Sequence, residues 1–316
     1  AIKEALNFKK LKINNIDFVA YSSKNLKLIN KIKSYFNFTF GYCPKIIPID
    51  HHTCHAYSAF YPSGFTKANI ITADFSGDGV STTINLGDKN GIKRIKEFKK
   101  PNSLGIFYGL ITQAIGFDLD NDEYKVMGLS SYGNPKYNFD KILKIDKNFY
   151  KLNKKIINSN ELNKSSSLNL SRQEPFYSNF LLKTLGIKKR ILNNINTKKK
   201  IDLAASAQYQ LNLAAESLFK WTYKKTKINN FCLAGGVALN CTMNKHLSNL
   251  DFVNNFYVQP ASSDAGNALG AAIYAAKKLK EKLIFRDNVY LGNSFKNSQI
   301  KKILKNNNLY KSVKKF

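Results

Sequence analysis

The strongest constraint on the fold is the alternation of short apolar strands with helices along the chain. Strands are predicted at residues 68–73 and 230–233, and each runs directly into a turn that contains glycine. A long amphipathic helix is predicted over residues 201–224, and a helix of small residues, suited to close packing, over 268–279. Strands that alternate with helices in this way are typical of an α/β protein.

The rest of the pattern consists of short elements and one variable region. A polar loop with acidic residues, 74–79, joins the strand 68–73 to a strand at 80–86, which predicts a hairpin. The segment 151–200 is rich in Lys, Asn and Ser and is predicted to be an irregular insertion. Other predictions are strands at 17–20, 45–48 and 256–259, helices at 26–35, 52–60 and 104–115 (the last capped by Ser103), and a polar stretch with glycine at 120–133.

Length and composition favour a globular protein. The chain has 316 residues, 43% of them hydrophobic, which is enough for a full core and two lobes. No segment approaches the roughly 18–20 apolar residues of a membrane-spanning helix, and the first residues lack the pattern of a signal peptide. Four widely spaced cysteines predict reduced thiols. We therefore expect a cytoplasmic protein with no membrane partner.

The formal net charge of +29 raises the question of nucleic-acid binding. Lysine is spread over almost every polar segment instead of being clustered, and the chain is also rich in Asn and Ile. A dispersed excess of this kind is typical of a solvated surface, so nucleic acid is not the expected partner. A positive field would still help to collect anionic substrates such as ATP.

The histidines give the sharpest chemical signal. Only four are present, and His51, His52 and His55 lie within five residues of one another. Residues four apart share one face of a helix, so His51 and His55 can direct two imidazoles to one metal ion; a pair of core or capping histidines is the alternative. Asp74 at the end of a strand and Asp264 before a helix are further carboxylate ligands, or ordinary turn and capping residues. Two imidazoles with carboxylates suit Fe(II), with Mn(II) and Zn(II) as rivals.

Glycine turns are the predicted phosphate-binding segments. Gly235 and Gly236 lie between a strand and a helix start, where backbone N–H groups favour anions. Gly77 and Gly79 have no side chains, so they would let another backbone segment approach phosphate oxygens closely. Lys125 is a possible positive contact to a phosphate or carbamoyl oxygen, although an exposed lysine is the commoner case.

Six ordered motifs together carry a family resemblance that covers nearly the whole chain. They resemble the N-terminal domain of the carbamoyltransferase family, which includes nodulation-factor and antibiotic O-carbamoyltransferases. The motifs are HHTCHAYSAFYPSGF (51–65), ITADFSGDGVSTT (71–83), SLGIFYGLITQAIGF (103–117), EYKVMGLSSYG (123–133), LAGGVALNCTMN (233–244) and QPASSDAGNALGAA (259–272).

The resemblance implies an actin-like ATPase (ribonuclease H-like) fold of two lobes, with the first lobe incomplete. Residues 1–66 would be the remnant of the first lobe, 67–283 the second lobe, and 284–316 the start of a linker toward a missing C-terminal YrdC-like domain. In the family that domain makes carbamoyladenylate from carbamoyl phosphate and ATP, and the actin-like domain passes the carbamoyl group to an acceptor hydroxyl. The chain would thus be cut short at both ends and unable to make carbamoyladenylate alone.

The resemblance also assigns residues. A divalent metal, Fe(II) above all, would be held by His51, His55, Asp74 and Asp264, and the nucleotide by the turn at Gly235 and Gly236 with Asn240 beside it. The acceptor would be a saccharide or another small molecule. Asp78 and His52 are the predicted general bases. Two rival interpretations are a tRNA threonylcarbamoyltransferase of the same superfamily and a non-catalytic basic module that binds nucleic acid.

Overall fold

The computed structural model describes residues 2–146, 148–158, 175–187, 197–285, 289–290 and 292–307. The chain divides into two compact units, Ala1–Leu283 and Ile284–Phe316. The second unit contains the helix α11, Asn297–Asn306. None of the helices in the described ranges is both long and apolar enough to cross a membrane.

The first unit is built on a five-stranded sheet with the order β5–β4–β3–β8–β9. The strands β3 (Ala68–Gly77), β4 (Val80–Asp88) and β5 (Gly91–Lys99) form an antiparallel meander, whereas β8 (Asn230–Ala234) and β9 (Asn255–Val258) run parallel to β3. This order and polarity are those of a ribonuclease H-like lobe. They confirm the predicted α/β, actin-like fold class.

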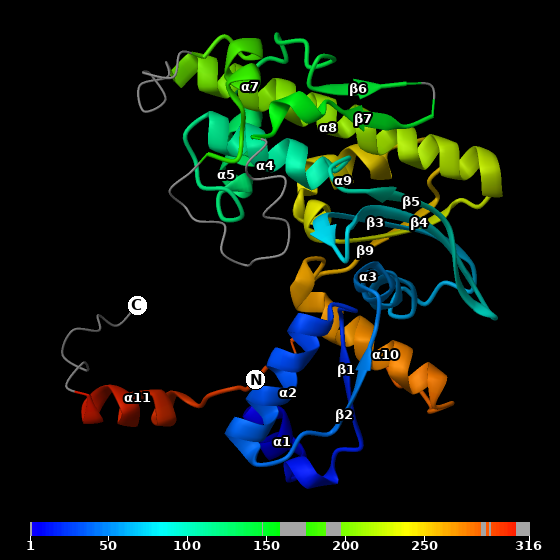
Figure 1. Cartoon of the computed structure of the whole chain (residues 1–316), viewed down its shortest axis with the longest axis vertical. Coiled ribbons are helices and arrows are strands. Elements are labelled where there is room, and N and C mark those ends of the chain that lie inside the picture. The colour runs from blue at the N-terminus through cyan, green and yellow to red at the C-terminus, as the bar shows by residue number, and fades with distance from the viewer. Residues whose placement is uncertain are drawn as a thin grey trace. The chain divides into compact units, whose positions relative to one another are not determined.

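Helices cover both faces of this sheet (Figure 1). On one face α4 (Leu104–Ala114) and α8 (Thr197–Thr226) bury the main core, and on the other α3 (His51–Phe60) packs against β3 and β8. The first residues of β3 are buried throughout, as expected for a central strand with both faces covered. The edge strand β5 instead carries Lys and Arg, which discourage pairing with another chain.

A smaller parallel pair lies on the other side of α3. It consists of β1 (Phe18–Tyr21) and β2 (Lys45–Pro48), joined through α2 (Leu26–Phe40). The helix α10 (Asn267–Lys278) packs against both α3 and β1. The small-residue sequence of α10 permits this close approach, since a side chain at Gly270 would overlap the backbone of Cys54.

The remaining elements are short, and several depart from the predictions. The hairpin turn contains only Asp78 and Gly79, both with positive φ, so β3 extends to Gly77 beyond the predicted end at residue 73. The strand β5 and a helix within the predicted polar stretch were not predicted. The helix within the polar stretch is α5 (Glu123–Ser130). The remaining short elements of the first unit are α1 (Ile2–Lys9), η1 (Ile13–Asn15), η4 (Gly236–Leu239), α9 (Cys241–Ser248) and η5 (Asp264–Gly266).

The predicted insertion 151–200 is described only in part, because residues 159–174 and 188–196 lie outside the described ranges. The described parts contain regular structure. They hold the end of β7 (Tyr150–Leu152), which pairs with β6 (Leu143–Ile145), then η2 (Lys154–Ile156), α7 (Asn179–Thr184) and the start of α8.

Candidate metal centre and adjoining cavity

The N-terminus of α3 fixes the two predicted imidazole ligands. Asp50 caps the helix, and its Oδ1 accepts hydrogen bonds from the Thr53 backbone N–H (2.9 Å) and hydroxyl (2.8 Å) and pairs with Arg94. The helix therefore begins at His51, and His55 follows one turn later on the same face. Their Nε2 atoms lie 3.1 Å apart. Two imidazole nitrogens thus point to the same place.

Two carboxylates from distant parts of the sequence reach this pair. The Oδ2 of Asp74, in β3, lies 3.2 Å from His51 Nε2 and 3.0 Å from His55 Nε2. The Oδ1 of Asp264, in η5, lies 3.2 Å and 3.5 Å from the same two atoms. We call His51, His55, Asp74 and Asp264 the four-residue cluster; its donor atoms all lie within 4.8 Å of one another.

Burial within the cluster is uneven. The side chain of His55 is fully buried, and those of His51 and Asp74 are 10% and 13% exposed, whereas that of Asp264 is 74% exposed. The accessible side of the cluster is therefore the Asp264 side. A molecule that reaches these atoms from solvent must arrive there.

The carboxylates and imidazoles strongly shift one another's protonation. Burial alone would lower the pKa of His51, but hydrogen bonds with Asp264 and Asp74 outweigh it and raise the pKa to about 10. Burial alone would raise the pKa of Asp74, yet the two imidazoles hold it well below its usual value. Hydrogen bonds from His51 and His55 lower the pKa of Asp264 to about 2. Both carboxylates are therefore ionised at neutral pH.

These donor atoms fit a divalent cation. Ligands bound at about 2.1 Å lie roughly 3.0–3.4 Å from their neighbours in tetrahedral or octahedral centres, and the distances of 3.0–3.5 Å that join the imidazoles to each other and to the carboxylates are close to this range. Two imidazoles and two carboxylates are a donor set that Fe(II), Mn(II) and Zn(II) all accept. The cluster brings together the four residues predicted as ligands.

A cavity of about 450 Å³ opens beside the cluster. Asp74 and Asp264 form part of its wall, together with Gly236 and Asn240 from the turn after β8, Tyr108 from α4 and Tyr124 from α5. This volume lies within the range of roughly 300–1,000 Å³ that small-molecule sites occupy. The cavity brings the cluster and the predicted nucleotide-binding turn to one space.

The turn after β8 is held by backbone packing and by amide side chains. Gly235 has φ +98°, and a side chain there would overlap the Ala73 carbonyl, so the β3–β8 contact requires glycine. Asn240 caps α9 by accepting the Met243 N–H (2.8 Å). Its amide exchanges hydrogen bonds with Gln208 at 2.9 Å and 3.0 Å, and the Tyr108 hydroxyl donates to Gln208 at 2.8 Å. The polar floor of the cavity is thus rigidly oriented.

The opposite wall carries two carboxyl groups that the sequence analysis missed. Asp120 and Glu123 line the cavity, and Glu123 Oε1 accepts the Asp120 N–H at 2.9 Å. Burial and the charge of Asp74 raise the pKa of Asp120, and burial raises that of Glu123. The density of acidic residues from Asp118 to Glu123 was the available signal. Asp120 has φ +66°, in the left-handed region that Asp adopts more readily than most other non-glycine residues.

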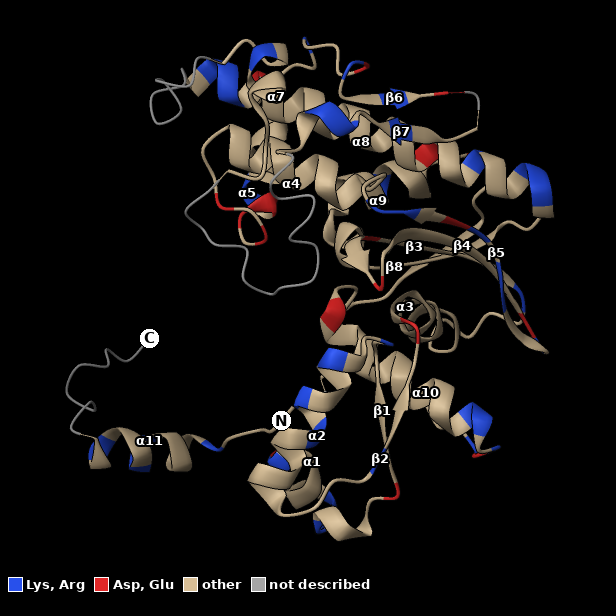
Figure 2. Ribbon diagram, viewed as in Figure 1, with Lys and Arg blue, Asp and Glu red and all other residues tan. Residues whose placement is uncertain are grey.

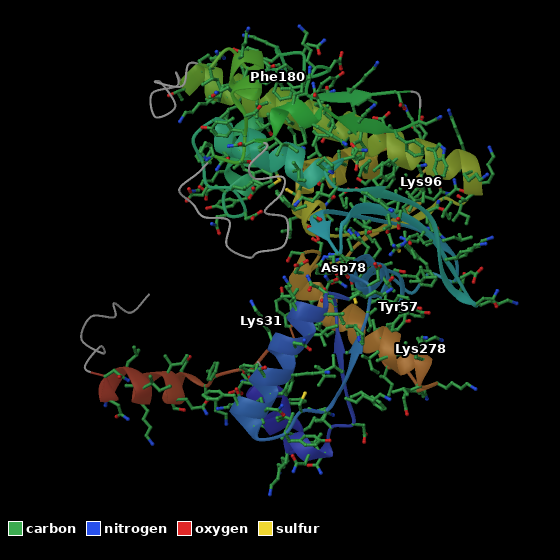
Figure 3. The ribbon with its side chains drawn as sticks, viewed as in Figure 1. Lys31, Tyr57, Asp78, Lys96, Phe180 and Lys278 are labelled. Carbon is green, nitrogen blue, oxygen red and sulfur yellow. The ribbon has the colours of Figure 1, made fainter. Side chains whose placement is uncertain are left out.

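The structure places Asp78 away from the cavity lining. Its carboxylate accepts hydrogen bonds from the Ser23 hydroxyl (2.8 Å), the Lys24 N–H (3.1 Å) and the His51 N–H (3.1 Å); Asp78 is labelled in Figure 3. Gly77 packs against the His51 ring, where a side chain would overlap it, and Gly79 completes the turn. These three residues tie the hairpin to α3 and to the loop before α2, and none of them is among the residues that line the cavity.

His52 and Lys125 are also directed elsewhere. His52 is fully buried; its ring nitrogens contact the Thr72 hydroxyl (2.7 Å) and the Val80 carbonyl (3.0 Å). Burial lowers its pKa to about 4, so its buried imidazole is neutral at pH 7, and His52 is not among the residues that line the cavity. The Lys125 ammonium pairs with Asp122 at 2.8 Å, and Lys125 is not among the residues that line the cavity.

Several known proteins are similar to this chain in sequence. Residues 6–273 match the family model described as carbamoyltransferase N-terminus. Nodulation protein NolO of Bradyrhizobium diazoefficiens is 33% identical over 256 residues, 79% of this chain and 43% of that protein. An uncharacterized Synechocystis protein is 32% identical over 274 residues, 83% of this chain and 42% of that protein. The chain spans less than half the length of these relatives.

Among solved structures, component A of the (R)-2-hydroxyglutaryl-CoA dehydratase of Acidaminococcus fermentans is similar, with a TM-score of 0.48 and 14% identity, covering 89% of this chain and 83% of that one. This likeness is weak, so the fold of the present chain is defined by its own sheet topology.

Proposed function

The chain belongs to the carbamoyltransferase family, and we propose that its cavity transfers a carbamoyl group from carbamoyladenylate to a hydroxyl of a saccharide or another small acceptor. One observation carries this proposal: Asp74 and Asp264, the two carboxylates of the four-residue cluster, lie in the wall of the same cavity as Gly236 of the turn after β8. One molecule bound in the cavity could therefore contact both a metal ion at the cluster and the turn proposed to hold the nucleotide.

The turn after β8 is proposed to hold the nucleotide. Gly236 lines the cavity without a side chain, so a phosphate can approach the backbone closely. Asn240 presents an amide whose orientation is fixed by Gln208. Fixed polar groups of this kind hold a substrate in the geometry needed for attack.

The four-residue cluster is proposed to hold a divalent cation, with Fe(II) as the first choice. Bound there, the cation would act as a Lewis acid toward the carbamoyl or phosphate oxygens. The residues themselves supply position: α3 and β3 hold three ligands rigidly, while Asp264 faces the accessible side. The cluster thus borders the space in which the substrate would react.

Asp120 is proposed to take the acceptor's proton, in place of Asp78 or His52. It lines the cavity, and its raised pKa favours proton acceptance. The acceptor O–H bond breaks and its proton moves to the Asp120 carboxylate. The acceptor oxygen bonds to the carbamoyl carbon, and the bond from that carbon to the phosphate oxygen of AMP breaks. AMP departs, and Asp120 later releases the proton to water.

The wall formed by Asp120, Glu123 and Tyr124 suits an uncharged acceptor rich in hydroxyl groups, because carboxylates accept hydrogen bonds from hydroxyls. The distribution of positive charge does not favour nucleic acid as the bound partner. Figure 2 shows Lys and Arg on α1, α2, α8, α10 and β5 of the first unit, instead of on one face of one element. The dispersed charge would instead assist capture of an anionic nucleotide.

The test is release of AMP from synthetic carbamoyladenylate by the purified chain in the presence of a sugar as hydroxyl acceptor, with and without added Fe(II) or Mn(II). We expect release to require the metal and to fall about a hundredfold or more in His55→Ala, because a buried ligand is lost. His52→Gln is the neighbouring control, since His52 does not face the cluster's donor atoms, and its release per folded molecule should persist. Equal metal-independent release by His55→Ala would contradict the proposal.

The donor is proposed to be made elsewhere, from carbamoyl phosphate and ATP, by a YrdC-like domain in a longer protein. These 316 residues alone should therefore form no carbamoyladenylate from the two precursors. Mass spectrometry of the reaction mixture checks this expectation. Appearance of carbamoyladenylate would show that the actin-like part itself activates the carbamoyl group.

A further inference from the structure

Glu123 holds the backbone of Asp120, the proposed base. Glu123 is the first residue of α5, and its Oε1 accepts the Asp120 N–H at 2.9 Å. Both residues line the cavity. This hydrogen bond therefore ties the start of α5 to the residue that is proposed to take the acceptor's proton.

The side chain of Glu123 lies against α4. A carbon added at Gly109, in α4, would be 3.4 Å from Glu123 Oε1 and 2.5 Å from Leu119 Cδ1. Glycine thus leaves space on α4 for two residues that flank Asp120 in sequence. Since α4 is packed in the main core, it gives the Glu123 carboxyl group a firm support beside the turn.

The backbone conformation of Asp120 gives this support a purpose. Its φ of +66° lies in the left-handed region, which is less favourable than extended or right-handed backbone even for aspartate. A side-chain oxygen that accepts a nearby backbone N–H stabilises such a turn. The backbone angles set the direction of the side chain, so the bond to Glu123 also sets where the Asp120 carboxylate points.

The carboxylate of Asp120 is available to a substrate. It accepts no hydrogen bond from any residue that the structure describes, and Asp120 lines the cavity. Asp122 belongs to the same turn but differs, since its carboxylate accepts the Asp118 N–H at 3.2 Å and pairs with Lys125 at 2.8 Å. The turn thus uses one carboxylate for its own structure and presents the other to the cavity.

We propose that Glu123 is a positioning residue, which acts by holding the Asp120 carboxylate toward the acceptor hydroxyl. This inference rests on the proposed role of Asp120 as the base, and it adds the residue on which that role depends. A base must lie within hydrogen-bond reach of the proton that it takes. Relaxation of the turn should therefore lower kcat and leave the binding of carbamoyladenylate unchanged.

The test is the rate of AMP release per folded molecule, from synthetic carbamoyladenylate with a sugar acceptor and added metal. Asp120→Asn should lower kcat about a hundredfold. Glu123→Ala and Glu123→Met remove the acceptor oxygen, so kcat should fall about tenfold while KM for carbamoyladenylate stays within about twofold. Glu123→Met keeps the length of the side chain and remains informative if the alanine variant folds poorly. Glu123→Gln keeps an acceptor oxygen and should retain kcat within about threefold.

A double variant separates positioning from a general loss of structure. Glu123→Met in the Asp120→Asn background should lower kcat no further, because Glu123 acts through a carboxylate that is already gone. A further fall of about tenfold in this background would show an independent effect and overturn the positioning role.

Asp122→Ala is the matched control. It removes a carboxylate of the same turn that neither lines the cavity nor bonds to Asp120, so kcat should match that of the parent. Parent-like kcat in Glu123→Met, or an equal fall in Glu123→Gln and Glu123→Met, would overturn the role of Glu123 and leave Asp120 as the base. Parent-like kcat in Asp120→Asn would overturn the base, and with it this inference.

Discussion

Two glycine turns leave neighbouring strands of the five-stranded sheet, and they have different roles. The turn after β3 contains Gly77 and Gly79 and contacts the protein itself, since Gly77 packs on His51 and Asp78 binds the start of α3. The turn after β8 contains Gly235 and Gly236 and borders the cavity. Gly77 and Gly235 are both required for internal packing, whereas Gly236 alone among these four glycines lines the cavity, where it leaves space for a ligand.

The largest expected effect is on folding, at Gly235. Alanine there would overlap the Ala73 carbonyl in a backbone conformation that essentially only glycine adopts. Gly235→Ala should lower the free energy of unfolding by about 3 kcal/mol or more, measured in urea. A loss below about 0.5 kcal/mol would mean that β3 and β8 separate easily at this point.

A smaller effect separates the two turns by ligand binding. In Gly236→Ala the new methyl group enters the cavity wall 2.9 Å from Asp74 Oδ1, and the affinity for AMP should fall about tenfold. Gly128→Ala is the control, because nothing lies within 4 Å of its added carbon; calorimetry should give the parent affinity for AMP. Equal affinities for AMP in the parent, Gly236→Ala and Gly128→Ala would mean that the turn after β8 does not border the bound ligand.

The smallest effect is expected at the other turn. Asp78→Asn tolerates the positive φ and keeps an acceptor oxygen, but it weakens charge-assisted bonds to Ser23, Lys24 and the His51 N–H. The free energy of unfolding should fall by about 1 kcal/mol, while AMP release per folded molecule stays near that of the parent. Loss of AMP release at unchanged stability would instead identify Asp78 as the general base.

Local periodicity predicted much of the fold. The four-residue spacing of His51 and His55 placed both imidazoles on one face, because helical geometry fixes it. The strand β5 was missed because its sequence, GIKRIKEFK, exposes Lys and Arg at an edge, where burial gives no clear alternation. The helix α5 has only eight residues and an internal glycine, Gly128, so its own helix signal is weak.

The site was less predictable because its chemistry depends on contacts between distant segments. The motif made His52 a candidate base beside the two predicted ligands, yet its ring nitrogens contact Thr72 and Val80 and it is buried. Asp120 carries no periodic signal, since a turn places it in the cavity lining.

The four-residue cluster joins segments at residues 51–55, 74 and 264, which are far apart in sequence. The four donor atoms come together only where these distant segments pack against one another, so the cluster does not exist in the unfolded chain. A cation would therefore bind the finished fold and scarcely its precursors. At a concentration a hundred times its dissociation constant, it would add about 2.7 kcal/mol to the native state. The fraction of chains that is folded would then depend on the concentration of the metal ion.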